Sequence, residues 1–372
     1  MTSVIEVRTR QRNYPVVVGF QVLDQLQGLL ENRLKGSNLF VIYDAQVFAL
    51  YGQVIRRYLK KAGLRQSEIC LSPGEKTKSR TQLDRLYAWL LDEKVTRNDM
   101  IIAVGGGVIS DLSGFVAATI LRGVSWGVIS TSLLGQVDAA IGGKTGINQK
   151  AGKNLIGSFW QPNFVLCDLC FLNTLPQRQM VNGFGEVARY AGLSGNGMIR
   201  QLDRFLDAGD LYDMDMLNKL VVQSVRYKAR IVSSDEREAG RRMLLNLGHT
   251  FAHGIEGSLG YRRLYHGEAV VLGLLGAIEL SIRHLGAKRD DLWPLTSLLY
   301  KLALPIPRVV LDPAQIINYM KLDKKRSVSD LRFVLLEAPG KPIIVQGIAP
   351  GEVRASVTAM VRYITDQGGK DA

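Results

Sequence analysis

Short apolar runs alternate with longer amphipathic stretches in the first 175 residues of the chain. Four runs predict strands: "SNLFVIYD" (37–44), "QSEICLS" (66–72), "DMIIAVGGG" (99–107) and "VSWGVIST" (124–131). Apolar positions recur with helical spacing between these runs, which predicts helices over 45–61, 79–93 and 108–119. Because strands and helices follow one another in turn, the pattern predicts a parallel α/β sheet.

The pattern changes after about residue 175, where helical periodicity dominates. Segments such as 217–232 and 266–286 place apolar residues on one helical face, and a short strand pair near 331–347 is the exception. A proline ends the preceding element at 174–176, where we expect a hinge. A chain of 372 residues is too long for one comfortable core. We therefore predict an α/β domain over 1–175 and a mainly α-helical domain over 176–372.

The formal net charge of +13 suits either a nucleic-acid partner or a small substrate with several negative charges. The basic residues are scattered and no nucleic-acid motif occurs, so we favour a small anionic substrate. The N-terminal "MTSVIEVRTRQRN" lacks the apolar core of a signal sequence, and the stretch 269–278 is only half a membrane span. We therefore expect a cytoplasmic protein that binds neither nucleic acid nor membrane.

A glycine-rich turn, "VGGGVISD" (104–111), joins a predicted strand to a predicted helix. Glycines there let backbone amide groups approach a phosphate at the positive end of the helix. The dinucleotide fingerprint is incomplete, because Ser110 stands at the third glycine position. The turn still favours a Rossmann-like nucleotide-binding domain. Asp44 ends another strand, where it could bind ribose hydroxyls or simply cap the next helix.

His249 and His253 stand four residues apart in "LLNLGHTFAHGIEG" (244–257), in a chain with four histidines. On a helix this spacing lets two imidazoles bind one metal, although either ring could instead be a hydrogen-bonded core residue. His266 opens the next predicted helix and could be a third ligand. The sequence therefore predicts a metal site without fixing its members.

The carboxylate ligand of such a site has several candidates, which are Glu186, Glu256 and Glu268. Spacing alone does not choose between them. A charged segment precedes the histidine helix and contains Lys228, Glu238 and Arg242. It could form either an exposed helix face or a charged wall of an active site, since arginine binds carboxylates and phosphates with two parallel hydrogen bonds.

Several ordered segments together resemble one known family over nearly the whole chain, the 3-dehydroquinate synthases. The segments are "SPGEKTKS" (72–79), "VGGGVISDLSGFVAAT" (104–119), "GQVDAAIGGKTGIN" (135–148), "GKNLIGSFWQP" (152–162), "TLPQRQ" (174–179), "GFGEVARY" (183–190), "DEREAGRRMLLNLGHTFAHGIE" (235–256), "HGEAVVLG" (266–273) and "KLDKK" (321–325). The resemblance implies the two-part fold predicted above, a homodimer, NAD, and a divalent metal that is zinc or cobalt.

The family's reaction belongs to the shikimate pathway of aromatic amino acid biosynthesis. It converts 3-deoxy-D-arabino-heptulosonate 7-phosphate to 3-dehydroquinate and phosphate. A hydroxyl is oxidised by NAD, phosphate is eliminated, the hydride returns, and the ring reforms as a carbocycle by an intramolecular aldol reaction. The resemblance thus implies a phosphate-eliminating lyase that regenerates NAD at each turnover. Two alternatives are a related sugar-phosphate cyclase with another substrate and a metal-dependent polyol dehydrogenase.

The family's functional residues carry over by motif to positions of this chain. Glu186, His249 and His266 become the expected metal ligands, whereas His253 is expected to face the substrate with Asn246. The other expected catalytic and substrate-binding residues are Arg122 (reaching the site of the partner subunit), Asp138, Lys144, Asn154, Lys228, Glu238 and Arg242, with Lys324 or Lys325 near the phosphate. The expected NAD-binding residues are Asp44, Glu75, Lys78, Gly106, Gly107, Asp111, Thr131, Ser132, Lys153, Thr174 and Gln179.

One position departs from the family pattern, which usually reads E-V-x-K where this chain has Glu186-Val187-Ala188-Arg189. Arginine keeps the charge but is planar and longer, so the exchange is not conservative at a tight site. It is either a tolerated substitution or a sign of an altered substrate. Arg242 and Asn246 are both present, which favours the heptulosonate phosphate with its carboxylate.

Overall fold

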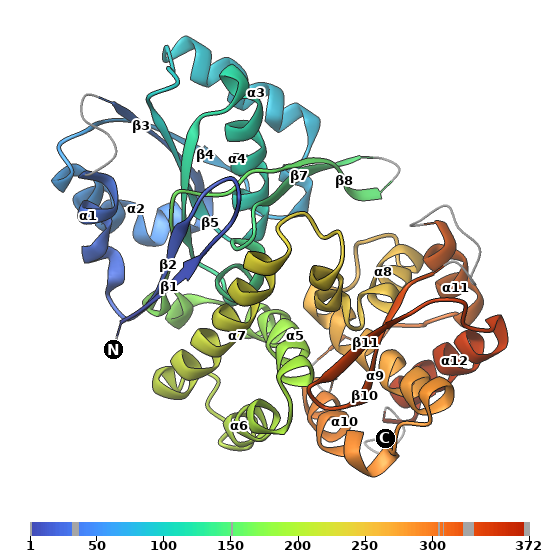
Figure 1. Ribbon diagram of the computed structural model, residues 1–372. Coiled ribbons are helices and arrows are strands. Elements are labelled where there is room, and N and C mark those ends of the chain that lie inside the picture. Colours follow the sequence, from blue (N-terminus) through green and yellow to red (C-terminus); the bar gives the residue numbers. More distant parts are fainter. Residues whose placement is uncertain are drawn as a thin grey trace. The chain divides into compact units, whose positions relative to one another are not determined.

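The computed structural model describes residues 2–31, 37–149, 152–303, 306–307, 309–322 and 331–367. The chain divides into two compact units, which Figure 1 shows in sequence colours. The first unit contains Met1–Leu175 and Val221–Arg237, and the second contains Pro176–Leu220 and Glu238–Ala372. Lys324 and Lys325, which the sequence placed near a phosphate, lie outside the described residues. Within the described ranges, no helix combines the length and apolar character needed to cross a bilayer.

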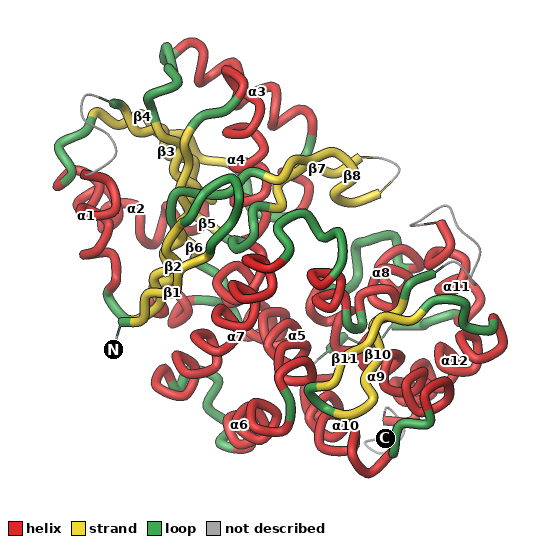
Figure 2. The backbone as a smooth tube through the Cα atoms, viewed as in Figure 1, coloured by secondary structure: helices red, strands yellow, loops and turns green. Residues whose placement is uncertain are grey.

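A seven-stranded sheet forms the centre of the first unit (Figure 2). Its strands are β1 (Ser3–Val7), β2 (Tyr14–Gly19), β3 (Asn38–Asp44), β4 (Arg65–Leu71), β5 (Met100–Gly105), β6 (Ser125–Ser130) and β9 (Val165–Asp168). They lie in the order β1-β2-β9-β6-β5-β3-β4. β1 pairs antiparallel with β2, and the other neighbouring strands pair in parallel. The predicted parallel α/β sheet is therefore confirmed.

The helices of the first unit are α1 (Leu26–Glu31), α2 (Ala45–Lys61), α3 (Arg80–Asp92) and α4 (Gly107–Thr119). The predicted helices over 45–61, 79–93 and 108–119 are thus confirmed, as are the four predicted strands. Leu30 of α1 and Leu59 of α2 join Val41 and Ile102 of the sheet in one buried cluster, because apolar residues at helical spacing lie on one face of each helix. An antiparallel hairpin, β7 (Lys144–Gln149) with β8 (Gly152–Phe159), follows the sheet strand β6.

The second unit is mainly helical, which confirms the predicted change of pattern. Its helices include α5 (Gln177–Ser194), α6 (Asn196–Asp207), the first part of α7 (Met214–Ser234), α8 (His249–Ser258), α9 (His266–Leu285), α10 (Arg289–Ala303), α11 (Pro313–Leu322) and α12 (Pro350–Gln367). Residues 267–281 of α9 are all buried, because small and apolar side chains surround the helix on every side. The hairpin of β10 (Phe333–Ala338) and β11 (Lys341–Val345) is the predicted strand pair.

The second half of α7 groups with the first unit, although the sequence assigned all of 176–372 to the second domain. Polar contacts explain the grouping. Lys228 Nζ donates to both the backbone oxygen and Oδ1 of Asp138 at 2.7 Å. The amide of Arg8 donates to Ser233 Oγ at 2.9 Å. Helical periodicity locates α7 in the sequence, but it does not show which unit each end of the helix contacts.

Candidate functional site

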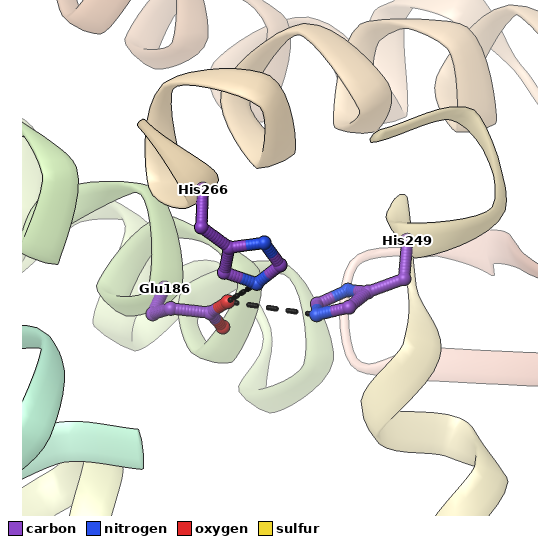
Figure 3. Close-up of side chains that lie close together, drawn as sticks. All are labelled: Glu186, His249 and His266. Atoms are coloured by element: carbon purple, nitrogen blue, oxygen red, sulfur yellow. Dashed lines mark ion pairs between the residues drawn. The ribbon is translucent and has the colours of Figure 1, made fainter. Parts of the chain in front are cut away.

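Three side chains from separate segments of the second unit converge on one point (Figure 3). Glu186 lies in α5, His249 is the first residue of α8, and His266 is the first residue of α9. Glu186 Oε1 lies 3.5 Å from His249 Nε2 and 3.3 Å from His266 Nε2. One donor atom from each residue lies within 4.8 Å of the other two, so the three can contact a single ion.

Glycines beside two of these residues let their helices cross in backbone contact. Gly185 precedes Glu186, and Gly267 follows His266. A Cβ on Gly185 would overlap the carbonyl group of Gly267, and a Cβ on Gly267 would overlap the carbonyl group of Asn182. α5 and α9 therefore approach as closely as backbones can, and this crossing brings Glu186 and His266 within reach of each other.

A third glycine positions His249. Gly248 has a φ of +78°, a left-handed conformation that glycine adopts without strain, and it directly precedes the first turn of α8. A Cβ there would lie 2.9 Å from the backbone nitrogen of Leu274 in α9. The start of α8 is thus held against the helix that carries His266.

Hydrogen bonds fix the orientation of both imidazoles. His249 Nδ1 lies 3.3 Å from the carbonyl oxygen of Leu247, and His266 Nδ1 lies 3.2 Å from Glu256 Oε2. Since Nδ1 can donate to these acceptors, Nε2 of each ring faces Glu186 and carries a lone pair whenever the ring is neutral. This is the tautomer in which Nε2 can bind a metal.

The two imidazoles differ in pKa because their surroundings differ. Burial lowers the pKa of His249 to about 3, which keeps the ring neutral. Burial also acts to lower the pKa of His266, but Glu256 and Glu186 outweigh it and raise the value to about 10. A metal binds neutral imidazole, so His249 is ready to bind one and His266 must first release its proton.

The remaining residues of the predicted metal site have other neighbours. Glu256 Oε2 lies 3.2 Å from Nδ1 of His266, on the side of the ring away from Glu186. Glu268 accepts a hydrogen bond from the amide of Tyr265 at 2.7 Å and forms an ion pair with Arg178 at 2.7 Å. Glu268 thus caps α9. The ring of His253 lies 5.8 Å from that of His249 and 6.3 Å from that of His266, beside the three-residue cluster rather than within it.

Two imidazole nitrogens and one carboxylate oxygen suit a divalent transition metal. Catalytic zinc sites use three protein ligands of these types and keep a further position for water or substrate. Glu186 is fully buried and the two histidines are partly exposed, so substrate can approach the cluster from the histidine side. The cluster therefore fits a catalytic rather than a closed structural metal site.

The glycine turn of the first unit lies at the carboxyl edge of the sheet, where β5 ends and α4 begins. Gly106 caps α4 with extended backbone, and a Cβ there would lie 2.9 Å from Ser132 Oγ. A Cβ on Gly107 would lie 3.0 Å from the Cβ of Ala139. The first turn of α4 has backbone amide groups without a partner inside the helix, which suits the anion expected at this turn.

Asp44 lies next to this turn. Its Oδ1 accepts hydrogen bonds from the amides of Gln46 at 2.9 Å and Val47 at 3.4 Å, so it caps α2. Its Cβ is also 3.3 Å from the place that a Cβ on Gly105 would occupy. Asp44 is therefore a helix cap, and its position at a strand end beside the glycine turn is also suitable for binding a ribose.

A polar network joins the loop after β4 to the β7–β8 hairpin. Lys78, with only 4% of its surface exposed, pairs with Asp111 Oδ2 at 2.5 Å and with the side-chain oxygen of Asn154. Asn148 Nδ2 donates to Glu75 Oε1 at 2.6 Å and its Oδ1 accepts from the amide of Asn154 at 3.0 Å. Burial raises the pKa of Asp111, and Lys78 opposes this. The network thus connects expected NAD-binding residues to an expected substrate-binding residue.

The other expected residues of the first unit lie near the strand ends and the hairpin. The amide of Thr131 donates to the Gly105 carbonyl at 3.0 Å. The hydroxyls of Thr174 and Tyr51 lie 2.8 Å apart. Arg122 has a φ of 64°, a left-handed conformation uncommon for a residue with a Cβ. Lys144 and Lys153 belong to β7 and β8, respectively.

The other expected residues of the second unit lie in α5 and in the segment before α8. Asn246 Nδ2 donates to Glu238 Oε1 at 2.9 Å, and Glu238 has a positive φ of 59°. Arg242 is 1% exposed. Gln179 accepts from Asn182 Nδ2 at 3.0 Å, and unlike the other expected NAD-binding residues it belongs to the second unit.

The sequence singled out Arg189 as a departure from the family pattern but did not predict its contact with the metal cluster, and it did not indicate Asn182. Arg189 pairs with Glu186 Oε2, and the three-residue spacing of this acid and base in a helix could have indicated the pair. Asn182 Oδ1 accepts from the amide of Gly267 at 2.7 Å, which secures the crossing of α5 and α9. No local pattern connects those two positions.

Known proteins resemble this chain in sequence. The family models described as the N-terminal and C-terminal parts of 3-dehydroquinate synthase match residues 68–182 and 183–326. The 3-dehydroquinate synthase of Crocosphaera subtropica is 36% identical over 366 residues, covering 97% of this chain and 100% of that protein. The enzyme of that name from Acinetobacter baumannii (strain AYE) is 39% identical over 344 residues, covering 92% and 94%.

Solved structures share the fold at lower identity. A 2-deoxy-scyllo-inosose synthase, solved with carbaglucose-6-phosphate, NAD+ and Co2+, has a TM-score of 0.87 and 23% identity, covering 96% of this chain and 99% of that one. ValA, a 2-epi-5-epi-valiolone synthase from Streptomyces hygroscopicus solved with NAD+ and Zn2+, has a TM-score of 0.84 and 24% identity, covering 95% and 98%. Sequence similarity over almost the full length of both proteins places this chain in the 3-dehydroquinate synthase family.

Proposed function

We propose that this protein is a 3-dehydroquinate synthase, which converts 3-deoxy-D-arabino-heptulosonate 7-phosphate to 3-dehydroquinate and phosphate. Membership of the family supports the reaction as a whole. The observation that carries the chemistry is the convergence of Glu186, His249 and His266 on one point. A family relationship without this cluster would leave the oxidation step without a metal site.

Glu186, His249 and His266 are the proposed ligands of zinc or cobalt. When bound, the ion would polarise one oxygen of the substrate. The carbon that carries this oxygen gives a hydride to NAD and later receives it back. The structures of two related cyclases with NAD+ and Co2+ or Zn2+ support both cofactors. Glu256 and the Leu247 carbonyl hold the two imidazoles in the tautomer that this role requires.

The dinucleotide is proposed to bind at the carboxyl edge of the first unit's sheet. The amino end of α4, with Gly106 and Gly107, would bind the pyrophosphate through backbone amide groups. Asp44 would accept hydrogen bonds from a ribose, and Thr131 and Ser132 lie at the end of the adjoining strand. The other proposed NAD-binding residues are Glu75, Lys78, Asp111, Lys153, Thr174 and, from the second unit, Gln179.

The anionic groups of the substrate require cationic and amide side chains. Lys228 is held by two contacts to Asp138, which orient its ammonium group. Asn246 is held by Glu238, so its amide has a fixed direction. The proposed set is completed by Arg122, Lys144, Asn154, Arg242 and His253. Their role is to bind and orient the phosphate and carboxylate, because such groups bind most strongly to charged or fixed donors.

We further propose a homodimer in the cytoplasm, with Arg122 acting in the site of the partner subunit. The left-handed backbone at Arg122 and the neighbouring Leu121, with φ values of 64° and 50°, supports a special role for this turn. Sedimentation of the purified protein tests the oligomeric state. Mixing inactive Arg122→Ala subunits with inactive His249→Ala subunits should restore activity in mixed dimers.

Phosphate release from the heptulosonate 7-phosphate tests the proposed reaction. Protein supplied with NAD and zinc should release phosphate and form 3-dehydroquinate without a steady-state increase in NADH. The Glu186→Gln variant, which loses a charged ligand, serves as the matched inactive control. Turnover of sedoheptulose 7-phosphate in place of the heptulosonate would identify a related cyclase, and continuous NADH accumulation with a polyol would identify a dehydrogenase.

A further inference from the structure

Arg189 is a buried guanidinium that bridges two parts of the metal cluster. Its side chain is 1% exposed, and Nε pairs directly with Oε2 of Glu186 one turn earlier in α5. Its Nη1 donates to the carbonyl oxygen of Leu245 at 2.7 Å. Leu245 lies in the segment that leads into α8, four residues before His249. Arg189 therefore links the helix of one ligand to the segment of another.

The two oxygens of Glu186 have different surroundings. Oε1 faces Nε2 of His249 and Nε2 of His266, at 3.5 and 3.3 Å. Oε2 is engaged by Arg189. Because Glu186 is fully buried, this fixed cation stabilises its carboxylate. The arrangement leaves one oxygen directed at the imidazoles.

We propose that Arg189 is a positioning residue that makes Glu186 a one-oxygen metal ligand and fixes that oxygen relative to His249. The proposal rests on the metal centre proposed above. A planar guanidinium can hold the carboxylate and the Leu245 carbonyl at once through two nitrogens, and the ring of Tyr190 lies 4.3 Å from its central carbon. A lysine has one nitrogen and cannot supply the same rigid fork.

Removal of Arg189 should alter both the strength and the geometry of metal binding. Loss of a partner that orients a ligand typically weakens metal affinity by about 10–100-fold, and we expect this for Arg189→Met. Arg189→Lys should give a smaller loss of about tenfold or less, since it keeps the charge but not the fork. With Oε2 released, the carboxylate can use both oxygens, which raises the number of ligand atoms around the metal.

The test compares metal binding, not turnover. Wild type, Arg189→Met and Arg189→Lys are titrated with zinc in competition with a chelator, and the visible absorption of each protein loaded with Co2+ is recorded. Co2+ absorbs less strongly as its ligand number rises above four, so the Arg189→Met spectrum should weaken. Arg283→Met is the matched control, because Arg283 also pairs with a glutamate within one helix, Glu279 at 3.8 Å, away from the cluster.

The outcomes separate the inference from the metal centre itself. If wild type binds zinc and Glu186→Gln does not, the centre stands. Folded Arg189 variants with wild-type affinity and a wild-type Co2+ spectrum would then overturn the role of Arg189 alone. If Arg189→Met does not fold, Arg189→Lys decides: an unchanged spectrum and affinity count against the proposal. Wild type that binds no zinc overturns the centre and the inference together.

Discussion

The glycine turn of the first unit and the metal cluster of the second unit are built in opposite ways. The turn is local, since residues 104–111 contain the strand end, the glycines and the helix start. The cluster is assembled from side chains of three helices, and its members reach one another because glycines let those helices cross closely. A backbone site can therefore be recognised in a short stretch of sequence, whereas a side-chain cluster depends on packing.

The largest expected effect separates the two histidines of α8. His249→Ala leaves two protein ligands, one fewer than catalytic zinc sites use. Loss of a residue that only orients a ligand weakens metal affinity by up to about 100-fold, so loss of a ligand itself should weaken zinc affinity by more than this. Phosphate release should stop with it. His253→Ala should keep its zinc and lose substrate binding or turnover instead, because its ring lies beside the cluster. Metal analysis of both purified variants is the measurement, and equal zinc loss would contradict this division of roles.

Lys78→Met tests how much one buried ion pair contributes to the stability of the first unit and to NAD binding. Lys78 and Asp111 have side-chain exposures of 5% and 20%, and removal of one partner from such a pair costs about 3–5 kcal/mol at full burial. We expect the free energy of unfolding to fall toward the lower end of that range, with weaker NAD binding. Arg80→Met is the control, since its exposed pair with Asp84 contributes about 0–1 kcal/mol.

The loss in Lys78→Met should depend on pH with a definite sign. Burial raises the folded-state pKa of Asp111 above its ordinary value of 3.8, and the variant lacks the lysine that opposes this. A carboxyl whose pKa is raised on folding favours the folded state while it is protonated, and this stability is lost as pH rises from 3.8 through the raised pKa. Denaturant unfolding should therefore show a smaller loss at acidic than at alkaline pH, and a loss that grows toward acid would contradict the assignment.

Gly267→Ala tests the packing that brings the ligands together. A methyl group there meets the backbone of α5, which cannot turn aside as a side chain could. Overpacking of this kind costs about 1–3 kcal/mol, and zinc affinity should fall because Glu186 and His266 move apart. Gly351→Ala is the matched control in α12: nothing lies within 4 Å of its Cβ, so it should be neutral or slightly stabilising. Thermal unfolding and zinc titration of both variants check the difference.

The sequence predicted the parallel strands β3, β4, β5 and β6 and their helices, because apolar runs and helical spacing are local properties. It did not predict β1, in which exposed and partly buried residues alternate at the edge of the sheet, or β2, which is mostly buried between β1 and β9. It also assigned all of 176–372 to one domain, whereas the second half of α7 groups with the first unit. Which unit a helix end contacts is decided by partners such as Asp138, far away in the sequence.

Spacing in the sequence gave the candidates for the metal site without choosing among them. His249 and His253 are close in sequence, yet the cluster joins His249 to Glu186 and His266. Glu256 and Glu268 were equally good ligands by spacing, and the helix crossing gives them other roles. Only the family resemblance selected the three ligands, because it carries information on packing that a single sequence does not show.

The smallest expected effect concerns the outer partner of His266. Glu256→Gln keeps the shape of the side chain but weakens the acceptor that holds His266 Nδ1 at 3.2 Å, so zinc affinity should fall by about 10-fold, at the low end for such partners. Glu352→Gln is the matched control, because Glu352 holds the nitrogen of His284 at 3.1 Å in the same unit without a metal ligand nearby. Zinc titration against a chelator measures both. If both variants bind zinc like wild type, the orientation of His266 comes from the packing of α9 and not from Glu256. The position of the backbone alone would then be sufficient to orient His266, as it is for the amide groups of the glycine turn.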